Sequence, residues 1–195
     1  AGSALKNIGF GLLMDAINSY LPSPAQRQAE TVADGGKTSK IPVSADGPLG
    51  AIVFKTTADP YVGKLTYFRV YSGVFASNSQ VWNCTRGETE RIGQLFIVKG
   101  KTQETVTQIS AGDIGGVAKL NITATGDTLC KQDKPVKLAP IAFPAPVFSQ
   151  AVYPKTKTDL DKLGAALNRL TEEEPTLHIR RDRETGETVL SGLGE

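Results

Sequence analysis

The first regular pattern along the chain is an amphipathic helix near the N-terminus. Its apolar positions recur at helical spacing, namely Ile8, Leu12, Leu13, Ala16, Ile17 and Tyr20. The run Leu21-Pro22-Ser23-Pro24 ends this helix, because proline cannot continue the helical hydrogen-bond ladder. From Ala25 to Gly47 the chain is polar and contains Asp34-Gly35-Gly36, which predicts a linker or an exposed loop over residues 25–47.

Residues 48–146 predict an all-β domain. Segments of strand length alternate with turns that contain Gly, Asn or Asp. The expected strands are Ala51–Lys55, Leu65–Phe75, Gln80–Cys84, Glu90–Val98, Glu104–Ile109 and Gly115–Leu120. Short strands at this spacing predict a closed β-barrel, since closure leaves no sheet edge free. A series of prolines, from Pro135 to Pro146, marks the end of this domain.

Residues 147–195 predict a β-α-β-β unit. A strand over Val147–Tyr153 precedes a helix from about Thr158 to Leu170, with Thr156 or Thr158 as its N-cap. Two further strands, Thr176–Arg181 and Glu187–Leu190, form a hairpin. This order is an incomplete ferredoxin-like unit, so we expect the chain to be part of a longer protein. The predicted fold class is mainly β with an α+β part.

Charge separates these sections more clearly than the total of +2 over 195 residues. Residues 48–148 carry eleven basic and seven acidic groups, a net +4, whereas residues 149–195 carry seven basic and nine acidic groups, a net −2. A mildly basic domain permits contact with a phosphate backbone, although a solvated surface with a small positive excess explains the charge equally well.

Composition excludes several chemistries. No run of apolar residues is long enough to span a membrane. Cys84 and Cys130 form no C-x-x-C pair and His178 is the only histidine, which excludes a structural zinc site with its usual ligands. His178 lies in an alternating segment and is interpreted as a half-exposed strand residue rather than a catalytic base. We expect the two cysteines to be reduced thiols of a cytoplasmic protein.

Several motifs together resemble bacterial translation elongation factor G or an elongation-factor-G-like paralogue. They are SALKN at 3–7, LLMDAI at 12–17, YLPSP at 20–24, DPYVGKLTYFRVYSG at 59–73, AGDI at 111–114, TGDTL at 125–129, EEEPT at 172–176, ETGET at 184–188 and SGLGE at 191–195. The resemblance implies that residues 1–24 end a GTPase domain. It also implies that 48–146 form the translation-factor β-barrel called domain II, and that 147–195 begin a ferredoxin-like domain III.

The resemblance implies a partial nucleotide site at Ser3, Ala4 and Leu5, whose backbone N–H groups would approach the guanine O6. The alternative is a turn before the helix, capped by Ser3. Neither a phosphate-binding P-loop nor an Asn-Lys-x-Asp motif occurs in the chain. We therefore expect no catalytic residue, no metal and no cofactor in this part, and no GTP hydrolysis. GTP and Mg²⁺ are implied for the full-length protein.

The resemblance implies the ribosome as partner, through small-subunit rRNA and protein of the decoding region. We expect no membrane or DNA contact and a monomeric chain. Lys64 and Arg69 are the predicted rRNA contacts, because both cations suit phosphate. The alternatives are a solvated turn lysine and an arginine paired with a carboxylate. Tyr61, Tyr67 and Tyr71 could stack on bases or belong to the barrel.

Two other functions remain open. A free-standing β-barrel could serve as an interaction or scaffold module. A translation-factor paralogue could lack translocase activity, since LFIVKGKT at 95–102 does not carry the Met-His-Ala pattern of the main translocase.

Overall fold

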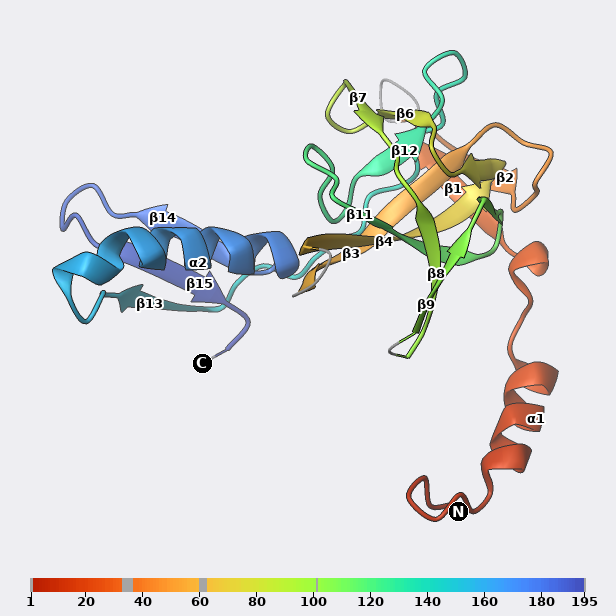
Figure 1. The fold of residues 1–195 in the computed structure, drawn as a ribbon, viewed down its shortest axis with the longest axis horizontal. Coiled ribbons are helices and arrows are strands. Elements are labelled where there is room, and N and C mark those ends of the chain that lie inside the picture. Colours follow the sequence, from red (N-terminus) through yellow and green to blue (C-terminus); the bar gives the residue numbers. More distant parts are fainter. Residues whose placement is uncertain (1, 33–36, 60–62, 101, 195) are drawn as a thin grey trace.

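A computed structural model describes residues 2–32, 37–59, 63–100 and 102–194. The chain forms a projecting N-terminal helix, a β-barrel-like domain and a small α/β unit, in that order (Figure 1). No helix among these residues is long and apolar enough to cross a membrane.

Helix α1 (Phe10–Tyr20) confirms the predicted helix. It begins after Gly9, whose φ of 75° lies in the left-handed region, and ends at Leu21, which is extended before Pro22. None of its residues is buried, and Leu12 remains 77% exposed. The apolar pattern that predicts the helix therefore meets no partner within the described residues.

The segment predicted to be a linker or exposed loop contains regular structure, so that prediction is wrong for part of it. After the short 3-10 helix η1 (Pro24–Gln26), strands β1 (Gln28–Val32) and β2 (Thr38–Pro42) pair antiparallel as a hairpin. Ala29 is buried and packs with Ile52 and Leu138 of the following domain. Packing of Ala29 and Ile41, together with backbone hydrogen bonds to residues 137–139, holds this hairpin on the barrel. Two apolar residues in a polar stretch are too few to predict these strands from periodicity.

The barrel-like domain contains an antiparallel eight-stranded sheet in the order β7-β6-β12-β3-β4-β11-β8-β9. The strands are β3 (Gly50–Asp59), β4 (Gly63–Ser72), β6 (Gln80–Asn83), β7 (Glu88–Arg91), β8 (Leu95–Lys99), β9 (Thr102–Val106), β11 (Ile114–Ala118) and β12 (Thr128–Cys130). A separate pair joins β5 (Val74–Ala76) to β10 (Gln108–Ser110). The core includes Phe68 and Phe75, whose rings meet edge to face with centroids 4.5 Å apart.

The structure divides three predicted strands and adds one, and in Glu104–Ile109 the break falls at residue 107, between β9 and β10. Gly73, with φ of 72°, separates β4 from β5 within the predicted Leu65–Phe75 strand. A Cβ at Gly73 would lie 2.8 Å from the Gly47 carbonyl oxygen, so this break requires glycine. Residues 92–94 likewise separate β7 from β8. Strand β12 was not predicted, because three residues are too few to show alternation.

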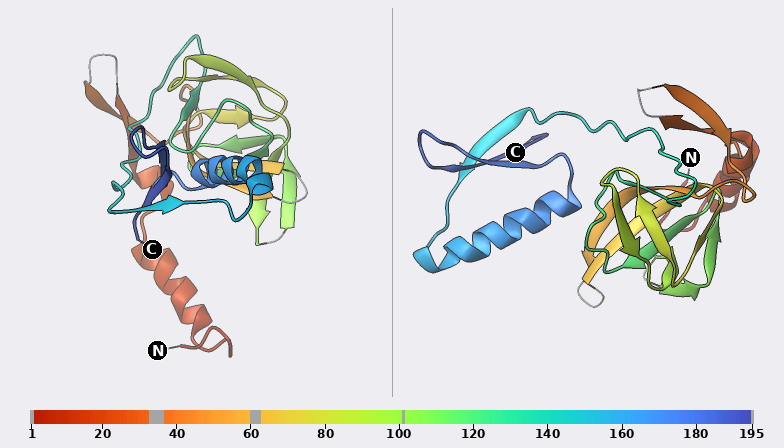
Figure 2. Two further views of the ribbon diagram at one scale, coloured as in Figure 1. Left: turned by 90° about the vertical axis from the view of Figure 1, so that its left-hand side faces the viewer. Right: turned by 90° about the horizontal axis from the view of Figure 1, so that it is seen from above.

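The C-terminal unit has the predicted β-α-β-β order. Strands β13 (Phe148–Val152), β14 (His178–Arg181) and β15 (Thr188–Gly192) form an antiparallel sheet in the order β13-β15-β14. Helix α2 (Leu160–Glu173) follows the 3-10 helix η2 (Lys157–Asp159) and lies along one side of this sheet (Figure 2). The predicted threonine N-cap is wrong, since Asp159 occupies that position without a side-chain cap and Thr156 instead donates to its carboxylate.

Cys84 and Cys130 are joined in a disulfide, which corrects the expectation of reduced thiols. Strands β6 and β12 pair with Cys130 opposite Trp82 and Leu129 opposite Asn83. This register brings the two cysteine Cα atoms to 6.5 Å, within the range that a disulfide bridges. The pairing depends on β12, the strand that the sequence pattern does not reveal.

Candidate functional site

Lys64 lies near the start of β4 and is held by two partners. Its Nζ donates to the Thr123 carbonyl oxygen at 3.0 Å and lies 3.8 Å from Glu172 Oε2. The side chain is 23% exposed, whereas that of Glu172 is 59% exposed. Lys64 is therefore not the free turn lysine that the sequence offered as an alternative, and its contact with rRNA stays a prediction. Lys64 joins the barrel to helix α2.

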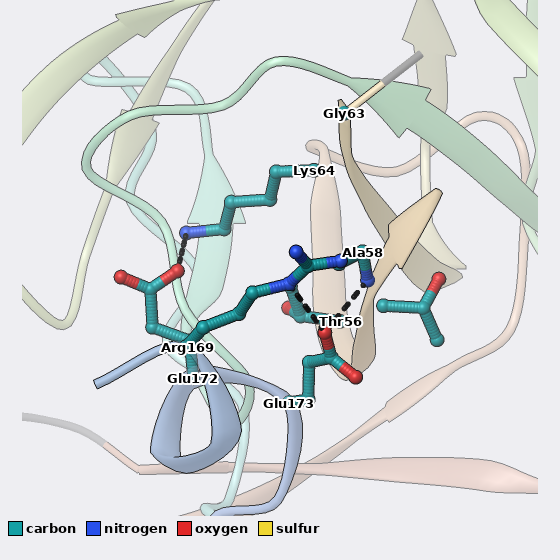
Figure 3. A pocket seen from close by; sticks show the side chains of 8 residues that line it. Thr56, Ala58, Gly63, Lys64, Arg169, Glu172 and Glu173 are labelled. Carbon is teal, nitrogen blue, oxygen red and sulfur yellow. Dashed lines mark hydrogen bonds and ion pairs between the residues drawn. The ribbon is translucent and has the colours of Figure 1, made fainter. Parts of the chain in front are cut away.

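The last turn of α2 makes a second contact with the barrel, through Glu173. Glu173 Oε1 accepts a hydrogen bond from the Ala58 backbone N–H at 3.1 Å and another from Arg169 Nε at 3.4 Å. Figure 3 shows these groups around a cavity of about 320 Å³, with Lys64 directed toward Glu172. Because Glu172 and Glu173 are consecutive, one helix end binds both β3 and β4.

Arg69, in the middle of β4, has a different environment. Its guanidinium carbon lies 5.3 Å from the centre of the Tyr71 ring, at cation–π distance. The Nε atom is buried without a hydrogen-bond partner, and no carboxylate pairs with this side chain among the described residues. The proposed cross-strand ion pair is therefore not what holds Arg69, since its neighbours across the ladder are Ile52 and Ile114.

The tyrosines that could stack on bases have different neighbours in the structure. Tyr71 faces Arg69, whereas Tyr67 lies beside Phe54 with ring centroids 6.4 Å apart. Tyr61 lies outside the residues that the structure describes. Of the two tyrosines that the structure describes, Tyr71 is the one that lies beside a predicted phosphate contact.

Ser3, Ala4 and Leu5 form a turn before α1. The backbone of Ser3 pairs with that of Ile8 through two hydrogen bonds of 3.0 Å, and Leu5 is fully exposed. Ser3 Oγ accepts from the Lys6 N–H at 3.4 Å, so Ser3 does not cap α1, whose N-cap is Gly9. Figure 1 shows this turn at the N-terminal end of the projecting helix, away from strand β4.

A buried polar network that the sequence analysis missed positions the acceptor of Lys64. The Glu90 carboxylate accepts from the backbone N–H groups of Ile122 and Thr123 at 2.9 and 3.0 Å and from the Thr123 hydroxyl. Asp127 Oδ2 accepts from Asn83 Nδ2 at 2.9 Å and from Arg86 Nε at 2.6 Å. The TGDTL motif, which contains Asp127, is the sequence signal for the contacts of Asp127. No such signal exists for Glu90, because it lies on β7 and only the fold brings it to Thr123.

The Glu174 carboxylate follows α2 and stabilises the next turn. Hydrogen bonds from the hydroxyl and the backbone N–H of Thr176 lower the pKa of Glu174 below its ordinary value, and the positive charge of Lys55 on the barrel adds to this shift. These hydrogen bonds favour the charged form of the Glu174 carboxylate and stabilise the turn that follows α2.

Comparisons with known proteins agree with this architecture. Residues 48–132 match the family model for elongation factor G domain 2, and residues 143–195 match that for elongation factor G, domain III. A crystal structure of a protein from Thermus thermophilus is similar, with a TM-score of 0.76 and 33% sequence identity over 98% of this chain. The chain spans 26% of the length of that protein. With two consecutive domain models matched in one chain, the protein belongs to the elongation factor G family and carries its domains 2 and III.

Proposed function

We propose that this chain acts as the ribosome-associating middle part of a translation elongation factor that promotes translocation in the cytoplasm. The barrel contacts small-subunit rRNA, and the α/β unit reaches protein and RNA of the decoding region. The observation that carries this proposal is the consecutive match to domains 2 and III of elongation factor G. The net +4 of residues 48–148 favours a phosphate-rich partner for the barrel.

Arg69 is the stronger of the two proposed rRNA contacts. Its Nε–H has no acceptor among the described residues, so the Arg69 guanidinium has a donor left to offer when it turns toward a phosphate. Lys64 already has the Thr123 carbonyl and Glu172 as partners, and it contributes to rRNA contact only as a positive charge near the surface. Lys64 also pairs with Glu172 of α2, so its replacement would affect the contact between α2 and the barrel as well as the charge of the barrel surface.

GTP chemistry belongs to the full-length protein in this proposal. The turn of Ser3, Ala4 and Leu5 lies at the guanine base, where the N–H groups of Ala4 and Leu5 are the donors, because the Ser3 N–H already donates to the Ile8 carbonyl. Phosphates and Mg²⁺ are bound by other parts of the factor. The 195-residue chain by itself neither binds GTP at micromolar concentration nor hydrolyses it. Isothermal titration with GTP and Mg²⁺ tests this, and a micromolar affinity would contradict it.

Co-sedimentation with small ribosomal subunits at increasing salt tests the ribosome proposal. The logarithm of the binding constant falls with the logarithm of salt concentration in proportion to the number of phosphate contacts. We expect Arg69→Ala to weaken binding and to reduce this slope by about one contact. Lys99→Ala is the matched control, because Lys99 is exposed and pairs with Glu104 at 3.1 Å. An unchanged slope in Arg69→Ala would remove Arg69 from the interface.

A further inference from the structure

Arg69 and Tyr71 form one side of a cavity of about 400 Å³ on the barrel surface. The other side is the segment that leads from α1 into the barrel, and it contributes Leu21, Pro22, Pro24 and Arg27. Strand β4 and residues 21–27 are far apart in sequence, so the cavity exists only because this segment lies against the sheet. It is separate from the Lys64 cavity, with which it shares no lining residue.

The charge in this cavity is positive and uncompensated. Arg27 and Arg69 both line it, and no acidic residue does so among the described part of the chain. Arg69 Nε is buried without an acceptor, although an arginine Nε–H is a strong donor. A buried charged donor without a partner is unfavourable, and a turn of the Arg69 guanidinium toward an anion in the cavity would give this donor its missing acceptor.

The wall that carries Arg27 is fixed by the fold. Ser23 forms a capping box with Gln26, in which each side chain accepts a hydrogen bond from the other end of the turn. Pro24 packs against Gly112, where φ is 99° and an added Cβ would lie 3.0 Å from the Pro24 Cβ. The segment can approach this closely because residue 112 is glycine. The backbone that carries Arg27 is therefore in place beside Arg69 before any ligand binds.

We propose that this cavity binds a phosphate group between Arg27 and Arg69. The planar guanidinium presents paired N–H donors that match phosphate oxygens, and two such groups suit a doubly charged or bridging anion. Tyr71 and the prolines provide flat apolar walls on which a base or sugar next to the phosphate can lie. The phosphate can come from an RNA backbone or from free phosphate. Only the assignment to RNA rests on the proposed function, and the phosphate site itself does not.

The test is a titration of the ¹⁵N-labelled 195-residue chain with inorganic phosphate, followed at the arginine Nε–H resonances by NMR. We expect the Arg69 Nε–H signal to shift saturably at millimolar phosphate. We expect Arg27→Gln and Arg69→Gln each to weaken binding at least fivefold. Arg27 is exposed, so its replacement leaves the fold intact even if replacement of Arg69 does not. Arg91→Gln is the matched control, because Arg91 is exposed and lies outside this cavity.

A shift that does not saturate, or one that Arg91→Gln weakens as strongly as Arg27→Gln, would overturn the site. A second titration with a short single-stranded RNA identifies the source of the ligand. Displacement of phosphate by RNA supports a backbone phosphate, and binding of phosphate without RNA competition supports a free phosphate. If the unmodified chain does not bind phosphate but co-sediments with small ribosomal subunits, only the proposed cavity site is refuted. If it binds phosphate but does not co-sediment, only the proposed function is refuted.

Discussion

Lys64 of strand β4 and Glu172 of helix α2 form an ion pair, with Nζ 3.8 Å from Oε2, that joins the barrel to the α/β unit. The adjacent Glu173 accepts from the Ala58 N–H at 3.1 Å on the neighbouring strand. These contacts connect domain 2 to domain III at one end of one helix. The relative position of the two domains therefore depends on a small number of polar contacts, which substitutions in α2 can remove.

We predict that the double variant Glu172→Gln/Glu173→Gln lets the two domains move more independently. Global stability should change by less than about 1 kcal/mol, because Glu172 is largely exposed and such pairs contribute little. Measurement of ¹⁵N relaxation should give separate rotational correlation times for the two domains. Glu184→Gln, at an exposed turn between β14 and β15, is the control. Unchanged correlation times in the double variant would show that other contacts set the domain arrangement.

We predict that Glu90→Gln destabilises the barrel by about 2 kcal/mol, since it replaces a buried acceptor with an amide that brings its own donors. Glu90 as a whole residue is 5% exposed, and its carboxylate accepts from the backbone N–H groups of Ile122 and Thr123. Urea unfolding followed by the Trp82 fluorescence measures the effect. Glu88→Gln, on the exposed side of the same strand, should change the free energy of unfolding by less than about 0.5 kcal/mol. Equal effects in the two variants would contradict the role of Glu90.

We predict that reduction of the Cys84–Cys130 disulfide lowers the free energy of unfolding by about 2–4 kcal/mol, because the bridge closes a long loop. The two cysteines are 46 residues apart in sequence. Denaturant unfolding with and without reductant measures this difference. A Cys84→Ser variant should unfold like the reduced chain and should not respond to reductant. If reductant affects that variant as much as the parent chain, the effect does not come from this bridge.

We predict that Thr176→Val raises the pKa of Glu174 toward its ordinary value of 4.5. The Thr176 hydroxyl donates to the Glu174 carboxylate at 2.6 Å and favours its charged form. A lowered pKa in the folded state contributes stability above the unfolded value, and this stability is lost as pH falls through the folded value. NMR titration of the Glu174 side chain measures the pKa directly. An unaltered pKa in Thr176→Val would assign the shift to another group.

Local patterns in the sequence predict much of the fold. The apolar spacing from Ile8 to Tyr20 predicts α1, and the alternation from Leu65 to Ser72 predicts β4. Both signals lie within one element, and they do not depend on what packs against it. The hairpin of β1 and β2 was missed because packing of Ala29 and Ile41 and backbone hydrogen bonds to residues 137–139 hold it in place. Its stability comes from tertiary packing, which sequence periodicity does not report.

The site was harder to predict than the fold for a related reason. The sequence identifies Lys64 and Arg69 as cations near one strand, but their roles depend on distant residues. Docking of α2 gives Lys64 its partner Glu172, and the position of Pro24 on the barrel gives Arg69 its cavity. The register of β6 against β12 likewise pairs the cysteines. Each of these relationships is set by a long-range contact.

Directed cleavage of rRNA is the measurement that tests the central claim, contact between this barrel and small-subunit rRNA, most directly. Ile114 is the cross-strand neighbour of Arg69 and is 50% exposed, so Ile114→Cys can carry a tethered iron chelate while the native cysteines remain in their disulfide. Bound to small ribosomal subunits, the labelled chain should cleave the rRNA at a few discrete positions, and Arg69→Ala should weaken this cleavage. Cleavage no stronger than that from untethered reagent, with the chain still bound to the subunits, would contradict the claim.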